Sequence, residues 1–259
     1  IYTPLGIFSN LLSAKLFTGF IISIITASVI FGGIKRIGSF ASRLVPSMVL
    51  LYMICGLIII FKNFSKIDDI FFSILSDAFT GNAMLGGAVG SLIITGIRRA
   101  AFSNEAGIGT EAMAHGAAIT KEPIREGLVA MLGPMIDTMI VCSVTGFTIL
   151  STGVWTDETL NGISMTSMAF SKGLPYIGQP ILLFIVITFS ITTIIGYSYY
   201  GSKCAAFLFG NKSKRFYRYF YILSLILASV VSIDIVVNLI DSLFAIMAIP
   251  TMISSIILA

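Results

Sequence analysis

Residues 98–116 read RRAAFSNEAGIGTEAMAHG, and their polar character sets them apart from the segments on either side. They place two arginines, two glutamates, an asparagine and the only histidine of the chain between strongly apolar neighbours. If those neighbours lie in a bilayer, so does this stretch. A charged side chain at the middle of a membrane costs about 2.5 to 3.5 kcal/mol, so such side chains normally face a protein interior or a water-filled path. The stretch is therefore the candidate functional site.

The composition of the chain indicates that its solvent is a lipid bilayer. Of its 259 residues 56% are hydrophobic and only 11% are charged, and the mean hydropathy is +1.00. An ordinary soluble domain has about 25% charged residues. The net charge of +4 does not indicate nucleic-acid binding, because the basic residues fall in short connections rather than on one face. The sequence therefore predicts an all-α integral membrane protein.

Hydropathy predicts seven membrane crossings. In chain order they are residues 16–34, 45–61, a discontinuous crossing at about 83–119, then 127–150, 180–200, 219–233 and 236–258. Pro46 is expected near the start of the second crossing, and Gly133-Pro134 is expected to interrupt the fourth. The last two crossings are expected to meet in a tight turn at Asp234. The chain begins with isoleucine and shows no signal peptide, so we expect it to be truncated.

The connections differ in charge on the two sides of the membrane. The expected loops at 35–43 and 203–218 carry three and five positive residues and no negative ones. The polar connections at 62–77 and 157–172 each sum to −1, and the turn at 121–126 sums to zero. The positive-inside rule therefore puts the two basic loops in the cytoplasm. Residues 70–75 are expected to form a short amphipathic helix, and Trp155 and Tyr176 to anchor the interface.

A break in the helix at Asn104 to Gly107 would create a binding site for a zwitterion. Backbone inside a membrane must satisfy its own hydrogen bonds unless it lines a cavity. The free N–H groups that begin the second half attract a carboxylate, whereas the free carbonyls that end the first half attract a cation or an ammonium group. Gly107 and Gly109 would let a ligand approach the backbone closely. An α-amino acid carries both charges on one carbon.

The same residues resemble a known family. The runs RAAFSNEAGIGTEAMAHGAA (99–118) and KEPIREGLVAMLGPMIDTMIVCSVTG (121–146) look like the alanine/glycine:cation, or sodium:alanine, symporters. Further agreement lies at VIFGGIKRIGSFASRLVPSMVLLY (29–52) and FSITTIIGYSYYGSKCAAFLFG (189–210). The resemblance implies an inverted repeat of five plus five helices, as in transporters of the leucine-transporter type. Residues 1–62 would hold the last two helices of the first repeat, 63–82 an extracellular connection, and 83–259 the second repeat. The first three helices of the first repeat would be missing.

The resemblance also implies roles for individual residues. The expected substrate-binding residues are Phe102, Ser103, Asn104 and Gly107 on the sixth helix of the fold, together with Tyr197 on the eighth. Thr192 and Thr193 are expected to contribute hydroxyls to a sodium site. Where this chain has Tyr197 the family often has tryptophan. If this ring bounds the side-chain pocket, the pocket differs in size and polarity, so the preferred amino acid stays open.

Each of these residues has a simpler alternative role. Phe102 and Tyr197 could pack between helices, Asn104 could cap a helix, and Thr192 and Thr193 could bond back to helix carbonyls. Arg98, Arg99 and Glu105 could pair with each other or with Asp241, or act in gating. For Asp137 and Asp241 the alternatives are interhelical hydrogen bonding and a place on the cation path. His115 is expected to pack or to make a local hydrogen bond. Cys55, Cys142 and Cys204 are expected to be free thiols, packed in or beside apolar segments.

The sequence thus predicts a secondary active transporter that carries alanine and glycine into the cell with sodium. No nucleophile with a base and no spaced histidines or cysteines indicate an enzyme, so no catalytic residue, resident metal or cofactor is expected. A proton-coupled permease of the same fold is the alternative, and an ion channel fits the discontinuous helix less well. The expected partners are the amino acid, sodium and lipid. We expect a monomer in the cell membrane, a bacterial inner membrane, and no nucleic acid.

Overall fold

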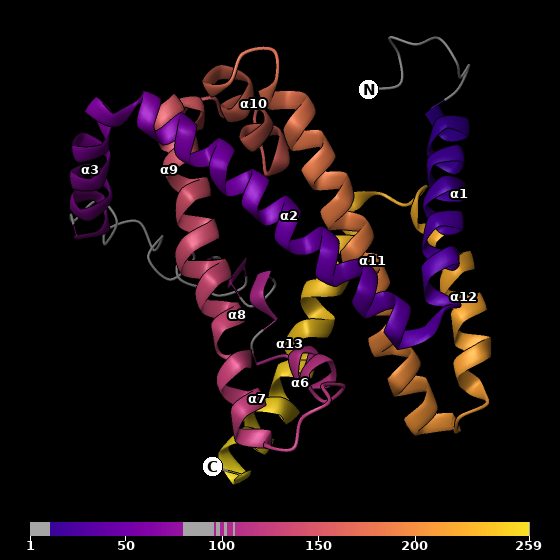
Figure 1. The fold of residues 1–259 in the computed structure, drawn as a ribbon. Coiled ribbons are helices and arrows are strands. Elements are labelled where there is room, and N and C mark those ends of the chain that lie inside the picture. The colour runs from indigo at the N-terminus through magenta and orange to yellow at the C-terminus, as the bar shows by residue number, and fades with distance from the viewer. Residues whose placement is uncertain (1–10, 80–95, 97–98, 101–102, 106, 259) are drawn as a thin grey trace. The chain divides into compact units, whose positions relative to one another are not determined.

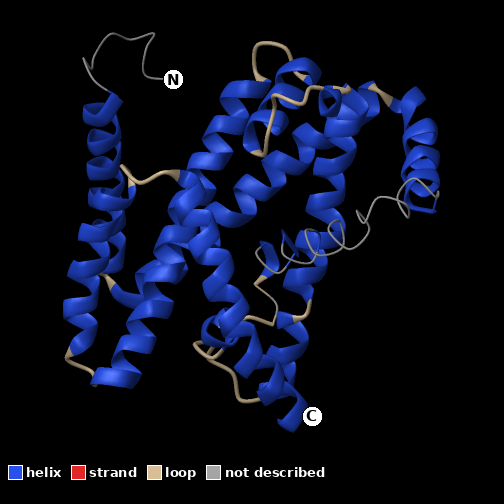
Figure 2. Cartoon of the chain, turned by 180° about the vertical axis from the view of Figure 1, so that it is seen from behind, coloured by secondary structure: helices blue, strands red, loops and turns tan. Residues whose placement is uncertain are grey.

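The computed structural model is helical throughout the part of the chain that it describes, which comprises residues 11–79, 96, 99–100, 103–105 and 107–258. Those residues form helices and connecting turns, with no strand among them (Figure 2). The predicted all-α class is therefore confirmed over this part. Five helical stretches are long and apolar enough to cross a membrane: Leu12–Ile30, Gly33–Lys62, Pro123–Thr152, Gly178–Phe209 and Ile235–Leu258. The chain is accordingly a multi-pass membrane protein.

Figure 1 shows the helical elements of the described residues in chain order. They are α1 (Leu11–Ile30), α2 (Gly33–Lys62), η1 (Phe64–Lys66), α3 (Ile67–Phe79), α6 (Thr110–His115), α7 (Pro123–Ala130), α8 (Leu132–Met135), the π-helix η2 (Ile136–Val141), α9 (Cys142–Thr152), η3 (Val154–Thr156), α10 (Ile163–Gly173), α11 (Gly178–Phe209), α12 (Ser213–Ala228) and α13 (Ile233–Leu258). The chain divides into two compact units, of which unit 1 holds residues 1–47 and 187–243 and unit 2 holds residues 48–186 and 244–259.

In unit 1, α1 lies alongside α12 (Figures 1 and 2). The two helices approach closely at Gly19, where a Cβ would stand 2.6 Å from the hydroxyl of Ser229. Ser23 Oγ donates to the carbonyl of Ile222 over 3.3 Å. Small residues at such a contact let helix backbones pack tightly in a membrane. The core of the unit is a buried apolar cluster of Val29, Ile37 and Ile195.

In unit 2, the second half of α2 packs with α10 and the start of α11. Their buried cluster is Cys55, Ile59, Phe170, Leu174 and Leu182. The ring of Tyr52 stacks on Phe170 with 5.4 Å between centroids. Helix α10 differs from the sequence-based expectation of a polar connection between residues 151 and 179. It packs through one buried face, made of Thr166, Ala169, Phe170 and Gly173.

Two of the expected basic loops are helical instead. Lys35, Arg36 and Arg43 lie inside α2, and the expected loop at 203–218 is reduced to residues 210–212 between α11 and α12. Lysine and arginine are good helix formers whose long stems reach toward polar surroundings, so they do not end a helix. The chain turns instead at Gly33 and Gly210, whose φ angles of 74° and 83° suit glycine. The lysine and arginine side chains therefore lie beside these turns and do not form separate basic loops.

Other boundaries also differ from the prediction. Pro46 lies well inside α2 rather than near a helix start, because the helix begins at Gly33. The turn expected at Asp234 lies at residues 229–232, and α13 already begins at Ile233. The amphipathic segment around residues 70–75 is helical, within α3. Of the cysteines, Cys55 is buried, whereas Cys142 and Cys204 are exposed rather than packed.

The seven expected crossings correspond only in part to the helices. The apolar first half of the discontinuous crossing, including Gly86 and Gly90, lies outside the described residues. The crossing expected at 219–233 corresponds to α12, which has 16 residues. At 1.5 Å per residue this helix is about 24 Å long, short of a bilayer core of about 30 Å.

Candidate functional site

The backbone leaves the helical conformation at the predicted place. Ser103 and Asn104 are helical, Glu105 has a φ of 58°, Gly107 and Gly109 have φ of 84° and 89°, and α6 begins at Thr110. Glycine adopts such angles at little cost. Among the described residues, Glu105 is one of only two that are not glycine and have a positive φ. The break expected at Asn104 to Gly107 is therefore observed at Glu105 to Gly109.

The helical residues before the break are held by hydrogen bonds to the π-helix η2. Ser103 Oγ donates to Asp137 Oδ2, and Asn104 Nδ2 donates to Thr138 Oγ1 over 2.9 Å. Asp137 and Thr138 are both half-buried. Asp137 therefore makes the interhelical hydrogen bond that was one of its two expected roles. The Asn104 side chain reaches across to another element, beyond simple capping of its own helix.

Sequence explains why the helix is interrupted before this point. Pro134 lies in α8 and has no N–H to donate to the carbonyl of Ala130, where α7 ends, and its ring crowds that carbonyl. The helix widens after the proline and returns to α geometry at Cys142. Short π-helical insertions of this kind occur frequently at functional sites. Gly133-Pro134 was expected to interrupt the helix, but the pattern did not indicate which geometry would follow.

A second chain of hydrogen bonds ties the end of the π-helix to α2. Thr145 Oγ1 donates to the carbonyl of Val141 over 2.8 Å. Because a hydroxyl has one hydrogen, Tyr52 must be the donor in its 2.6 Å bond with Thr145 Oγ1. The π-helix is thus bonded at its start to the broken segment and at its end to a long helix of the same unit.

The first residue after the break carries a buried hydroxyl that sequence analysis did not single out. Thr110 is 3% exposed, and its Oγ1 has no hydrogen-bond partner among the described residues. Leaving a buried polar group unpaired costs about 1 to 3 kcal/mol. Thr251 lies beside the same turn, since a Cβ at Gly109 would stand 2.9 Å from its Oγ1. The only sequence signal for Thr110 was its position directly after the glycines.

The residues expected on the eighth helix lie in α11, within unit 1. Thr192 is buried, and its Oγ1 donates to the carbonyl of Phe189 over 2.8 Å. This is the bond back to a helix carbonyl that was the alternative to a sodium site, although the hydroxyl oxygen keeps lone pairs for a cation. Thr193 is exposed, and Tyr197 is half-buried with its ring edge-on to Tyr200 at 5.5 Å.

The candidate residues are thus divided between the two units. Ser103, Asn104 and Gly107 belong to unit 2, and Thr192, Thr193 and Tyr197 belong to unit 1. The structure brings Ser103 and Asn104 together with Asp137 and Thr138. Phe102 and Arg98 lie outside the described residues.

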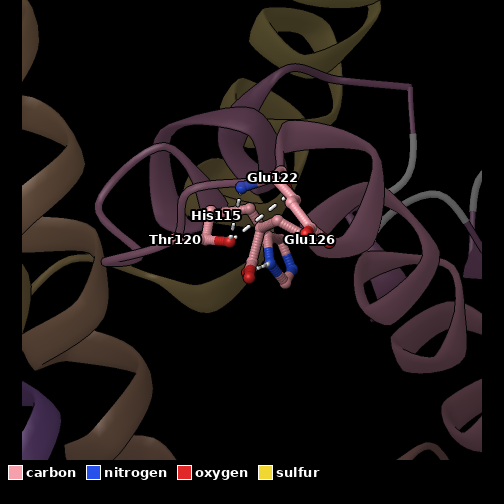
Figure 3. A network of polar contacts seen from close by, with 4 residues as sticks. All are labelled: His115, Thr120, Glu122 and Glu126. Atoms are coloured by element: carbon pink, nitrogen blue, oxygen red, sulfur yellow. Dashed lines mark hydrogen bonds and ion pairs between the residues drawn. The ribbon is translucent and has the colours of Figure 1, made fainter.

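One side-chain hydrogen bond closes the corner between α6 and α7. His115 Nδ1 lies 2.8 Å from Glu126 Oε1 (Figure 3). Beside it the backbone N–H of Glu122 donates to Thr120 Oγ1 over 3.2 Å, in the turn that precedes α7. The local hydrogen bond expected for His115 is therefore confirmed. Among the described residues no ion pair joins Arg99 to Glu105, so that expected pairing is not found there.

The sequence of the chain is similar to those of known proteins. A family model described as the sodium:alanine symporter family matches residues 5–259. The chain is 38% identical over 256 residues to the sodium/alanine symporter AgcS of Methanococcus maripaludis, a match that covers 97% of this chain and 56% of the relative. It is 37% identical over 244 residues to an uncharacterized transporter of Haemophilus influenzae, which covers 92% of this chain and 54% of the relative.

A further relative differs in the cation that its name specifies. The putative sodium/proton-dependent alanine carrier protein YrbD of Bacillus subtilis is 33% identical over 232 residues, which covers 81% of this chain and 48% of the relative. The chain spans about half the length of the curated relatives it matches.

We predict that Asn104 and Thr138 are energetically coupled. In a double-mutant cycle of Asn104→Ala and Thr138→Val, unfolding of the full-length protein by SDS titration should give a coupling free energy of about 0.6 kcal/mol, with an upper bound of about 1.7 kcal/mol. The matched control pairs Asn104→Ala with Thr152→Val, because the Thr152 hydroxyl bonds only its own helix. A coupling no larger than that of the control pair would show that the hydrogen bond does not hold the break.

Proposed function

Because the chain belongs to the sodium:alanine symporter family, we propose that the whole protein is a secondary active transporter that couples sodium entry to uptake of small neutral amino acids. Alanine and glycine are the proposed substrates. Membership in a transporter family agrees with the expectation that the protein is not an enzyme. The name of the relative from M. maripaludis, a sodium/alanine symporter, supports this choice of cation and substrate.

The observation that carries the proposal is the break between Glu105 and Gly109. At the break the backbone N–H of Ile108 donates to the carbonyl of Glu105 over 3.3 Å, and the proposed contacts of the amino acid's ammonium and carboxylate groups are with the other carbonyls before this turn and the other N–H groups after it. Two glycines with left-handed φ angles allow the ligand to approach the backbone. The bonds to Asp137 and Thr138 keep the first piece in position, which reduces the entropy lost on binding.

The residues that we propose for binding are those that the family resemblance implies. The amino acid would contact Phe102, Ser103, Asn104, Gly107 and Tyr197, and sodium would be held by Thr192 and Thr193. We add Thr110, because its buried and unpaired hydroxyl lies directly after the break. The order we propose is sodium first, since an ordered cation site prepares the broken helix for the zwitterion before the bundle rocks inward.

The architecture that goes with this function is an inverted repeat with seven crossings in the present chain. Residues 1–62 would hold two helices of the first repeat, 63–82 an extracellular connection, and 83–259 the second repeat. The basic helix ends beside Gly33 and Gly210 would face the cytoplasm. We propose that the protein acts as a monomer in a bacterial inner membrane.

Coupling to a cation provides enough energy for accumulation. One positive charge moved through a membrane potential of 100 mV yields about 2.3 kcal/mol, which corresponds to about fifty-fold accumulation before any chemical gradient of the cation is counted. A proton could supply the same electrical energy. That alternative is supported by the relative named a sodium/proton-dependent alanine carrier, and the two differ in which gradient drives uptake.

Asn104→Leu should reduce alanine uptake at least a hundredfold, because leucine keeps the size of the side chain but removes the amide that bonds Thr138 beside the break. Uptake of labelled alanine by cells with equal amounts of folded protein at the membrane measures this effect. Asn238→Leu, the same change at an exposed position of α13, is the control and should transport normally. Full transport by the Asn104 variant would remove Asn104 from the site.

Tyr197→Trp should change the preference among glycine, alanine and serine by about threefold to tenfold, because a larger and less polar ring narrows a pocket that it bounds. Competition of the three unlabelled amino acids against labelled alanine measures the preference. Tyr219→Trp, an identical change at an exposed side chain, should leave it unaltered. An unchanged profile in the Tyr197 variant would assign that ring to helix packing.

A further inference from the structure

Unit 1 contains a pocket whose chemistry differs from that of the broken helix. It has a volume of about 190 Å3 and is lined by Ile30, Ile34, Ile37, Ser198, Tyr199, Ser202, Lys203, Lys214 and Arg218. Every one of these residues belongs to unit 1. They come from the end of α1 and the start of α2, from residues 198–203 of α11, and from the first turns of α12, elements that Figure 1 shows side by side in this unit.

Three cations converge on this pocket without a counter-charge. No carboxylate lines it, and among the described residues none forms an ion pair with Lys203, Lys214 or Arg218. The excess of positive over negative charge extends to the whole of unit 1. Its sequence has nine lysines and arginines and two aspartates, Asp234 and Asp241, neither of which lines the pocket. The positive charge is therefore not neutralised within the unit.

The positions of the cations on their helices are unfavourable unless an anion is present. Lys214 and Arg218 lie one turn apart on α12, where like charges repel each other. Lys214 is also in the first turn of that helix, at the positive end of its dipole, and no acidic residue occurs in that turn. Both side chains are half-buried, which raises the cost of their unpaired charge. A bound anion would remove all three penalties.

The other walls define the kind of anion. The hydroxyls of Ser198 and Ser202 already donate to helix carbonyls over 2.6 and 2.8 Å, so the side-chain donors left for a ligand are the three cations and the phenol of Tyr199. The ammonium group of Lys203 lies over the ring of Tyr199 at 5.4 Å from its centroid, which holds it near the pocket. The three other lining residues are isoleucines. A phosphate group attached to an apolar chain fits this combination of cationic and aliphatic walls.

We propose that this pocket binds the phosphate group of an anionic phospholipid headgroup. Lys214, Arg218 and Lys203 contact the phosphate oxygens, and the side chains of Ile30, Ile34 and Ile37 contact the start of the acyl chains. The turn between α1 and α2 and the turn between α11 and α12 connect the helices that line the pocket. Both turns carry the positive charge that the positive-inside rule assigns to the cytoplasmic side. Basic pockets between helices on that side are known to hold anionic headgroups. This binding is independent of the proposed transport activity.

The test uses the full-length protein, purified in detergent and stripped of lipid. Native mass spectrometry measures binding of phosphatidylglycerol and of phosphatidylcholine with the same acyl chains. The pocket variant combines Lys214→Gln with Arg218→Gln. The matched control combines Lys212→Gln with Arg215→Gln, which removes one lysine and one arginine from the same turn and helix at positions that do not line the pocket.

We expect wild type and control to bind phosphatidylglycerol at least tenfold more tightly than phosphatidylcholine. The pocket variant should bind phosphatidylglycerol about 25-fold more weakly than the control, or about fivefold for each cation removed. Equal binding by the pocket variant and the control would overturn the proposal, and so would equal binding of the two lipids by wild type.

A second measurement separates the two sources of a phosphate group and does not depend on the folding of the double variant. Millimolar inorganic phosphate should displace phosphatidylglycerol from wild type only partly, because it lacks the acyl chains. If inorganic phosphate binds as tightly as the lipid, the pocket binds free phosphate and the lipid assignment is wrong. Arg218→Lys keeps the charge and should retain binding within about fivefold of wild type; a loss as large as that of the double variant would contradict recognition by charge.

Discussion

The structure depends on one constraint: backbone N–H and carbonyl groups inside a membrane must find partners. At Glu105, Gly107 and Gly109 the backbone leaves the helix with positive φ angles, and the N–H of Ile108 donates to the carbonyl of Glu105. Backbone groups that such a turn leaves unpaired would be costly if they faced lipid. Beside the turn, the side chains of Ser103 and Asn104 bond to Asp137 and Thr138.

The partner of the broken segment is a second irregular stretch of backbone. The π-helix η2 follows the interruption at Pro134, and this widened turn presents Asp137 and Thr138. Thr145 and Tyr52 then connect the end of the same turn to α2. Two irregular stretches of backbone thus support each other, and the regular helices around them provide the rigid frame.

The sequence was sufficient to predict some of these features, for identifiable physical reasons. The break was predictable because glycines and charged residues between apolar segments are costly in a membrane unless they line a polar site. The helix ends were not predictable: lysines and arginines near Gly33 and Gly210 suggested loops, yet they are good helix formers and all but Lys212 lie within α2, α11 and α12. Helix α10 escaped prediction because its buried face includes Thr166 and Gly173 beside Ala169 and Phe170, so no clear apolar pattern marks it. The pairing of Asn104 with Thr138 depends on the π-turn, whose widened geometry no periodicity in the sequence indicates.

The central claim is that the broken helix serves to bind an amino acid that is carried with sodium. Uptake of labelled alanine into proteoliposomes that hold the full-length protein, with and without an inward sodium gradient, tests it most directly. If the claim is correct, uptake rises with the sodium gradient and falls when unlabelled glycine competes. Uptake driven by a proton gradient and indifferent to sodium would contradict the cation assignment. Alanine that stays outside under either gradient would contradict the claim as a whole.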